Sequence, residues 1–175
     1  MVWAPRYFAV QEEGVIDNAL FIIQRDFKEA LDVFYPMEAA LSPDDPQYLE
    51  DFQEHELGQI QKLVFPCLAI GPNRNAATES DARDRLKQAV RFDLYLGVTG
   101  DSAATVTRKI MKYVGTLDAV LRSARKSDWS RNMSTIIFGV VLEVEHVYGS
   151  VRMDRDKSIS YRDALMQVTL LFNEQ

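Results

Sequence analysis

Cysteine is nearly absent from this chain, which has one, Cys67, among 175 residues. One cysteine cannot close an internal disulfide, so the sequence excludes a disulfide-stapled extracellular module and favours a reducing compartment. Long apolar runs are absent as well: none approaches the ~18 residues that cross a bilayer, and residues 1–10 lack the charged-then-apolar order of a secretory signal. We therefore expect the protein to remain in the compartment where it is made.

Motifs that carry chemistry are also missing. The chain has no glycine-rich phosphate loop, no Gly-x-Ser-x-Gly elbow and no Walker lysine. His55-Glu56 begins like the zinc protease motif, but Gln59 stands where the second histidine belongs, and His146 is the one other histidine. Since a catalytic zinc needs three protein ligands, the sequence predicts no metal site, no cofactor and no enzymatic activity.

The remaining reactive side chains have structural interpretations. Cys67 has no histidine or basic run beside it to activate it, so we expect a buried, inert thiol. His146 continues the inward register of Val144 on an expected strand, where a hydrogen-bonded structural histidine is the common outcome. Glu143 and Glu145 share the opposite face of that strand, and we expect them to lie in solvent and not to form an acid/base pair.

Composition bounds the fold. With 47% apolar and 26% charged residues, the chain matches an ordinary globular protein, and its length favours a single α+β domain over residues 1–175. Three segments stand apart from the expected core: an aromatic N-terminal arm (1–13), an acidic insertion carrying a short helix (41–58) and a charged connector (149–160). The arm forms either an edge strand on its own sheet or an extension onto a neighbour.

Two amphipathic helices are predicted from apolar residues at spacings of three and four. The first spans Ile16 to Phe34 and is stopped by Pro36, and the second spans Ser102 to Ala124, with Asp101 or Ser102 as its N-cap. Their expected buried stripes are Ile16, Leu20, Ile23, Phe27, Leu31 and Phe34 in the first, and Val106, Ile110, Tyr113, Val114, Leu117, Val120 and Leu121 in the second.

Alternating apolar and polar residues predict three strands, at residues 91–98, 135–148 and 164–172, and residues 60–70 are expected to be an edge or bent strand because they contain Pro66. The inward residues of these three strands are expected to be Phe92, Leu94, Leu96 and Val98; Ile136, Phe138, Val140, Leu142 and Val144; and Ala164, Met166, Val168, Leu170 and Phe172. The last two strands read as an antiparallel pair. The element order predicts a single mostly antiparallel sheet with two main helices packed on one face, plus the acidic insertion loop.

Charge is distributed unevenly along the chain. The whole chain carries −6, but residues 12–56 hold thirteen acids against two bases, a balance of −11, whereas residues 101–131 hold seven bases against three acids, a balance of +4. The basic residues of the second helix could bind nucleic acid, but the overall acidity and the lack of interleaved aromatic residues argue against a stacking platform. A charge-complementary contact between protein subunits explains both poles.

Two sets of residues are therefore candidates for protein contacts. The first is a self-interface that pairs Glu50, Asp51 and Glu54 with Arg122, Arg125 and Lys126. The second is a partner-contact loop in the connector, which we expect to be mobile in the free subunit because its charges cannot be buried. The loop candidates are Arg152, Asp154, Arg155, Asp156 and Lys157.

The order of elements resembles the tail terminator and head-to-tail joining (neck) proteins of tailed bacteriophages. The residues that carry the resemblance are the helix Ile16 to Phe34, the strand Arg91 to Val98, the helix Ser102 to Ala124 and the closing pair Glu143 to Gln175. The resemblance spans residues 14–172, and the acidic segment 41–58 departs from the compact family layout.

The resemblance implies a structural virion protein with no active site, assembled in the host cytoplasm. Its subunits would form a homo-oligomeric ring, by resemblance a hexamer, that caps the tail tube and joins it to the head connector or stopper protein, with DNA passing through without specific binding. Two alternatives stay open: another tail, neck or baseplate-type structural subunit, and a small non-viral regulatory or ligand-binding α+β domain.

Overall fold

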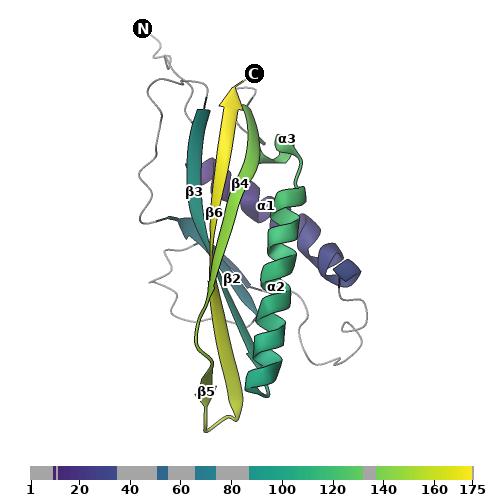
Figure 1. Ribbon diagram of the computed structural model, residues 1–175, viewed down its shortest axis with the longest axis vertical. Helices are drawn as coiled ribbons and strands as arrows, with labels where there is room; N and C mark the ends of the chain where they lie inside the picture. The colour runs from purple at the N-terminus through teal and green to yellow at the C-terminus, as the bar shows by residue number, and fades with distance from the viewer. Residues whose placement is uncertain are drawn as a thin grey trace.

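The computed structural model describes residues 10, 12–34, 51–54, 66–73, 87–131 and 137–174, and only the backbone of 12, 51–54, 87, 137, 138, 173 and 174. Over these residues the protein is an α+β fold in which one mostly antiparallel sheet carries helices on one side (Figure 1). The fold class predicted from the sequence is confirmed. The N-terminal arm before Val10, and Glu50 and His55 in the acidic insertion, lie outside the described residues.

The sheet has the strand order β1-β2-β3-β6-β4, and β5 pairs with the end of β6. All these pairs are antiparallel except β1 with β2. The strand bounds are β1 Asp51–Glu54, β2 Cys67–Pro72, β3 Lys87–Gly100, β4 Ile137–Tyr148, β5 Arg152–Asp154 and β6 Ile159–Glu174. The longest pairing joins β3 to β6 and forms the middle of the sheet.

Both long helices pack on the same face of this sheet. They are α1 (Glu12–Phe34) and α2 (Ala103–Ser123), and a short third helix, α3 (Lys126–Trp129), follows α2. The N-cap of α2 is Ser102, whose Oγ accepts a hydrogen bond from Thr105 N at 3.2 Å. This geometry confirms one of the two predicted caps, because it pairs an otherwise unpartnered amide of the first helical turn.

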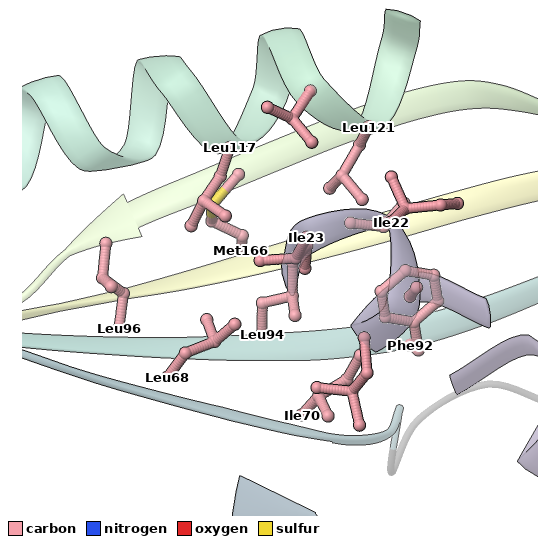
Figure 2. Close-up of a cluster of buried hydrophobic side chains, with 14 of the residues drawn as sticks. Ile22, Ile23, Leu68, Ile70, Phe92, Leu94, Leu96, Leu117, Leu121 and Met166 are labelled. Carbon is pink, nitrogen blue, oxygen red and sulfur yellow. The ribbon is translucent and has the colours of Figure 1, made fainter. Parts of the chain in front are cut away.

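The core lies between the two helices and the sheet. Figure 2 shows Ile22 and Ile23 of α1 meeting Leu117 and Leu121 of α2 above Leu94 of β3. Every predicted stripe residue of α2 is buried. In α1, Leu20, Ile23, Phe27 and Leu31 are buried as predicted, but Phe34, the last residue of the helix, is 53% exposed.

Two expectations about the first strands are wrong. Residues 51–54 of the acidic insertion form β1, a strand parallel to β2, and not part of a helix. Strand β2 begins at Cys67, directly after Pro66, so that proline lies outside the strand, and residues Cys67 to Ile70 pair with both β1 and β3. Consequently β2 is an inner strand and not the edge.

The expected inward face of β4 is also wrong in part, because the strand contains a bulge between Val141 and Glu143. Directly opposed residues on antiparallel strands share a face. Val141 pairs with Leu170 and Val144 with Val168, so both face the helices, whereas Val140 pairs with Leu171 on the open face. Val140 and Leu142, expected inside, are 40% and 60% exposed.

The connector at residues 149–160 is not a loop along its whole length. It contains β5, which pairs through Arg152 with Tyr161 and through Asp154 with Ile159. The turn between them is stabilised by Asp154 Oδ1, which accepts hydrogen bonds from the backbone N–H groups of Asp156 at 3.1 Å and Lys157 at 3.3 Å. The connector is therefore an ordered hairpin tip that extends the sheet (Figure 1).

Candidate interaction surfaces

The predicted basic residues gather where α2 ends and α3 begins. Arg122, Arg125 and Lys126 are all exposed. Arg122 Nε donates to Asp118 Oδ1 at 2.7 Å, one helical turn earlier. Such a surface pair contributes little to stability, so Arg122 remains available to a partner. The three side chains form one basic surface.

A buried amide holds this basic surface in place. Asn18 of α1 is 2% exposed, and its Nδ2 donates to Trp129 O at 2.9 Å and to Arg131 O at 3.1 Å. Trp129, which is 1% exposed, packs against Phe92 of β3 with ring centroids 6.4 Å apart. The segment after α2 is therefore fixed to both α1 and the sheet.

An ion pair on the surface reinforces the same joint. The Arg25 guanidinium donates to both carboxylate oxygens of Asp128, at 3.2 and 3.0 Å, and also to Asp26. The hydrogen bonds from Arg25 lower the pKa of Asp128 despite its partial burial. The Arg131 guanidinium stacks over the Phe21 ring at 3.7 Å. These contacts link α1 to α3 outside the core.

The acidic candidates lie at the other side of the sheet. Asp51 and Glu54 are the first and last residues of β1, which forms one edge of the sheet. Helix α3 packs beside β4, which forms the opposite edge. With strands ~4.8 Å apart, the two edges are about 19 Å apart. The fold therefore presents the acidic strand and the basic surface on opposite edges, although the sequence alone left their relative position open.

The hairpin tip rests on a carboxylate at its base. Asp163 Oδ2 accepts hydrogen bonds from Tyr95 Oη at 3.0 Å and from Arg152 Nη2 at 2.6 Å. Burial, and then the Asp163 charge, raise the pKa of Tyr95. A Cβ at Gly149 would overlap Asp163 Oδ1, so this arrangement requires glycine beside the carboxylate. Arg152, predicted as a partner contact, is thus also structural.

A second arginine secures the hairpin from the helix side. Arg162 Nε donates to Gly149 O at 3.0 Å, and its Nη1 donates to Thr107 Oγ1 of α2 at 2.7 Å. Its guanidinium also lies 5.5 Å from the centre of the Tyr148 ring. The hairpin is consequently tied to the first turns of α2.

The other predicted loop residues lie at the exposed end of this hairpin. Asp154 turns inward to the backbone of the turn, whereas the side chains of Arg155 and Lys157 form no ion pair within the described part of the chain. Met153, which the sequence analysis did not single out, is 63% exposed beside them. An apolar residue at an expected loop was the signal for it.

A groove of about 320 Å³, which no sequence pattern predicted, lies between the last turns of α1 and α2. Its apolar walls include Val33 and Phe34 from α1 and Ala119 and Val120 from α2. Phe34 was assigned to the core stripe, and Val33 lies outside it. Two large apolar residues in succession before Pro36 were the signal that the helix end is only half covered.

The reactive side chains form no recognisable catalytic arrangement among the described residues. Cys67 is buried, as predicted. His146 keeps the predicted register of Val144, since it pairs with Met166, but it is exposed and packs edge-on against Tyr148 at 5.1 Å, so its expected burial is wrong. Glu143 and Glu145 are exposed, as predicted. Among described residues, no group of three or more His, Cys, Asp and Glu is placed to hold a metal ion.

Comparison with known proteins finds no match to this chain, either among protein-family models or among curated proteins. Within the described residues, the helices lack the combined length and hydropathy that crossing a bilayer requires.

Proposed function

We propose that this protein is a structural subunit of a phage tail, resembling a tail terminator, that assembles into a ring joining the tail tube to the head connector. In this proposal the protein acts by assembly and not by catalysis. The observation that carries it is the position of the two unlike charged elements: acidic β1 at one edge of the sheet, and Arg122, Arg125 and Lys126 beside the other.

Ring formation needs this kind of asymmetry. A head-to-tail ring uses two different patches on each subunit, and opposite charges on those patches fix the order of subunits and suppress wrong pairings. Two patches on opposite edges allow one subunit to contact a neighbour on each side. A monomer has no use for this separation.

The element order supports the resemblance on which the proposal rests. The four segments that carry it correspond to α1, β3, α2 and the β4–β6 pair, and these form the core of the fold. In this proposal the ring caps the tube, receives the head connector on its other side and lets DNA pass without specific contacts.

Negative-stain imaging combined with mass measurement across protein concentrations tests the function. Purified protein, alone and mixed with tail tube protein, should give closed rings, free or seated on tube ends. Open tubes of this protein would favour another tail or baseplate subunit. A monomer that retains a small molecule through purification would favour the regulatory or ligand-binding domain.

A further inference from the structure

The groove between α1 and α2 is small, open and partly apolar. At about 320 Å³ it lies at the lower end of the ~300–1,000 Å³ range of ligand pockets, and it is open to one side. Val33 and Phe34 on its wall are 69% and 53% exposed. The groove therefore offers apolar surface to one or two side chains and not an enclosure for a small molecule.

The α1 side of the groove is acidic and can face basic groups of a partner, whereas Arg122, at the α2 side, is paired with Asp118. Asp26 and Glu29 stand on its rim. Asp26 is paired with Arg25 at 2.7 Å, whereas Glu29 forms no ion pair within the described residues. The last turn of α1 contains no basic residue, so nothing on that turn offsets the partial negative charge of the helix C-terminus.

The hairpin tip carries an exposed apolar side chain and basic side chains, which complement the apolar wall and the acidic residues of the groove. Met153 is 63% exposed on it, and the exposed residues Arg155, Asp156 and Lys157 follow, so the tip carries one more base than acid there. The Asp154 turn and the Arg152–Asp163 ion pair, at 2.6 Å, hold the tip in one conformation. A rigid apolar and basic projection loses little conformational freedom on binding.

A copy of the protein cannot place its own tip in its own groove. Met153 pairs with Ser160, which also pairs with Gly100, just before the N-cap of α2. The groove lies at the other end of α2, beside Ala119. At ~1.5 Å per residue the helix separates the two by about 24 Å, and Figure 1 shows β5 at the far end of α2 from α3.

We propose that the β5–β6 tip of one copy docks in the α1–α2 groove of the next copy. Met153 enters between Val33 and Ala119, and Arg155 and Lys157 face Glu29. The contact is head-to-tail, because it joins two different patches. It rests on the proposed self-assembling function and names a specific contact between subunits, separate from the β1 and α2–α3 charges.

Cysteine cross-linking between two differently marked chains tests the contact. In a Cys67→Ala background, one chain carries Met153→Cys and the other carries Val33→Cys, and the two are mixed and mildly oxidised. We expect a disulfide-linked heterodimer at least tenfold more abundant than in a control mixture of Met111→Cys and Val33→Cys. Met111 is a suitable control because it is a similarly exposed methionine, 55% accessible, on α2.

A charge exchange gives a second readout. Replacing Arg155 and Lys157 by Glu should weaken self-association, measured by sedimentation, at least tenfold, and adding Glu29→Lys to the same chain should restore most of it. Met153→Asp should block association, whereas Met153→Leu should retain it. The tip is exposed, so circular dichroism should show all these variants folded.

The outcomes separate the docking from the ring. Closed rings without the Met153–Val33 cross-link would overturn the docking and leave the proposed function standing. The cross-link in open chains, with no closed rings on tube ends, would support the docking and contradict the terminator function. A protein that gives no cross-link at its highest soluble concentration contradicts the docking, and tube binding then decides the function by itself.

Discussion

Asn18 and Trp129, 111 residues apart in the chain, are joined by a 2.9 Å hydrogen bond from the Asn18 side-chain amide to the Trp129 carbonyl oxygen. The same nitrogen donates to Arg131 O. This buried amide connects the first helix to the segment that carries the basic surface, so the position of that surface depends on a polar group inside the fold.

Asn18→Ala should therefore destabilise the protein by about 1–3 kcal/mol, because the Trp129 and Arg131 carbonyls lose their buried donor. Urea denaturation followed by tryptophan fluorescence measures the change. Gln24→Ala on the exposed side of α1 is the control and should change stability by less than about 0.5 kcal/mol. Equal effects of the two substitutions would show that the Asn18 bond has no special weight.

Two glycines should respond oppositely to the same change. Gly149→Ala should cost about 1–3 kcal/mol, because the added methyl overlaps Asp163 and forces it from Arg152 and Tyr95. Gly115→Ala should instead stabilise the protein by about 0.5–1 kcal/mol, since nothing lies within 4 Å of a Cβ at that exposed helical position. Thermal unfolding of both variants checks the pair, and a neutral Gly149→Ala would contradict the clash.

The Arg25–Asp128 ion pair should make stability depend on pH in the acidic range. The pKa of folded Asp128 lies below its ordinary value, mainly because Arg25 donates to it. Its contribution is therefore fully present above the unfolded pKa of ~3.9 and is lost as pH falls through the lower folded pKa. Because Arg25 is 40% exposed, the contribution should be only ~0.2–1 kcal/mol.

Asp128→Asn should remove that part of the acid sensitivity. Urea midpoints at pH 7 and pH 3 should differ less in Asp128→Asn than in the unmodified protein. Asp17→Asn, at an exposed position of α1, serves as the control. If the two variants lose the same amount of stability at pH 7, the ion pair makes no separate contribution.

Self-assembly through the charged edges should respond to charge reversal. Changing Arg122, Arg125 and Lys126 to Glu should block ring formation while the monomer stays folded, because all three side chains are exposed. Changing Glu50, Asp51 and Glu54 to Lys in the same chain should partly restore assembly. The effect should weaken as salt screens charges beyond a Debye length of ~10 Å at 0.1 M.

Arg91→Glu combined with Arg108→Glu provides a control, since both arginines are exposed elsewhere on the fold. Light scattering at low and high salt gives the measurement. Normal assembly of the triple Glu variant at low salt would mean that the acidic and basic residues do not pair between subunits and only face solvent.

The helices and central strands could be predicted because their periodicity and their burial agree. Val106 to Leu121 repeat at helical spacing and pack inward, and Phe92 to Val98 alternate as a half-buried strand does. In these elements the apolar residues that the sequence pattern places on one face are the residues that the core buries.

The buried face of β4 could not be predicted correctly, because the residues of β4 by themselves do not show the bulge. Phe138, Val140, Leu142 and Val144 alternate without interruption in the sequence. The side each one faces is set by pairing with β6, where the bulge shifts the register after Val141. A pattern read from one strand cannot contain that shift.

The sequence predicted which charged residues form the candidate surfaces, but not where on the fold these surfaces lie. The acidic segment and the basic helix end could be listed from the sequence, but their opposite edges follow from the long-range pairing of β1 with β2. The groove was not predictable at all, since its walls come from α1 and α2, more than eighty residues apart, and exist only after the helices pack.

Because of its bulge, β4 contains one residue more than its pairing with β6 requires. Val141 and Val144 face the helices and Glu143 faces away, so Leu142 is the surplus residue between them. Deleting Leu142 would leave every other side chain of β4 on its present side, whereas deleting a residue from β3 would move half of that strand's apolar side chains into solvent. This sheet can therefore lose Leu142 from β4 and keep the same core.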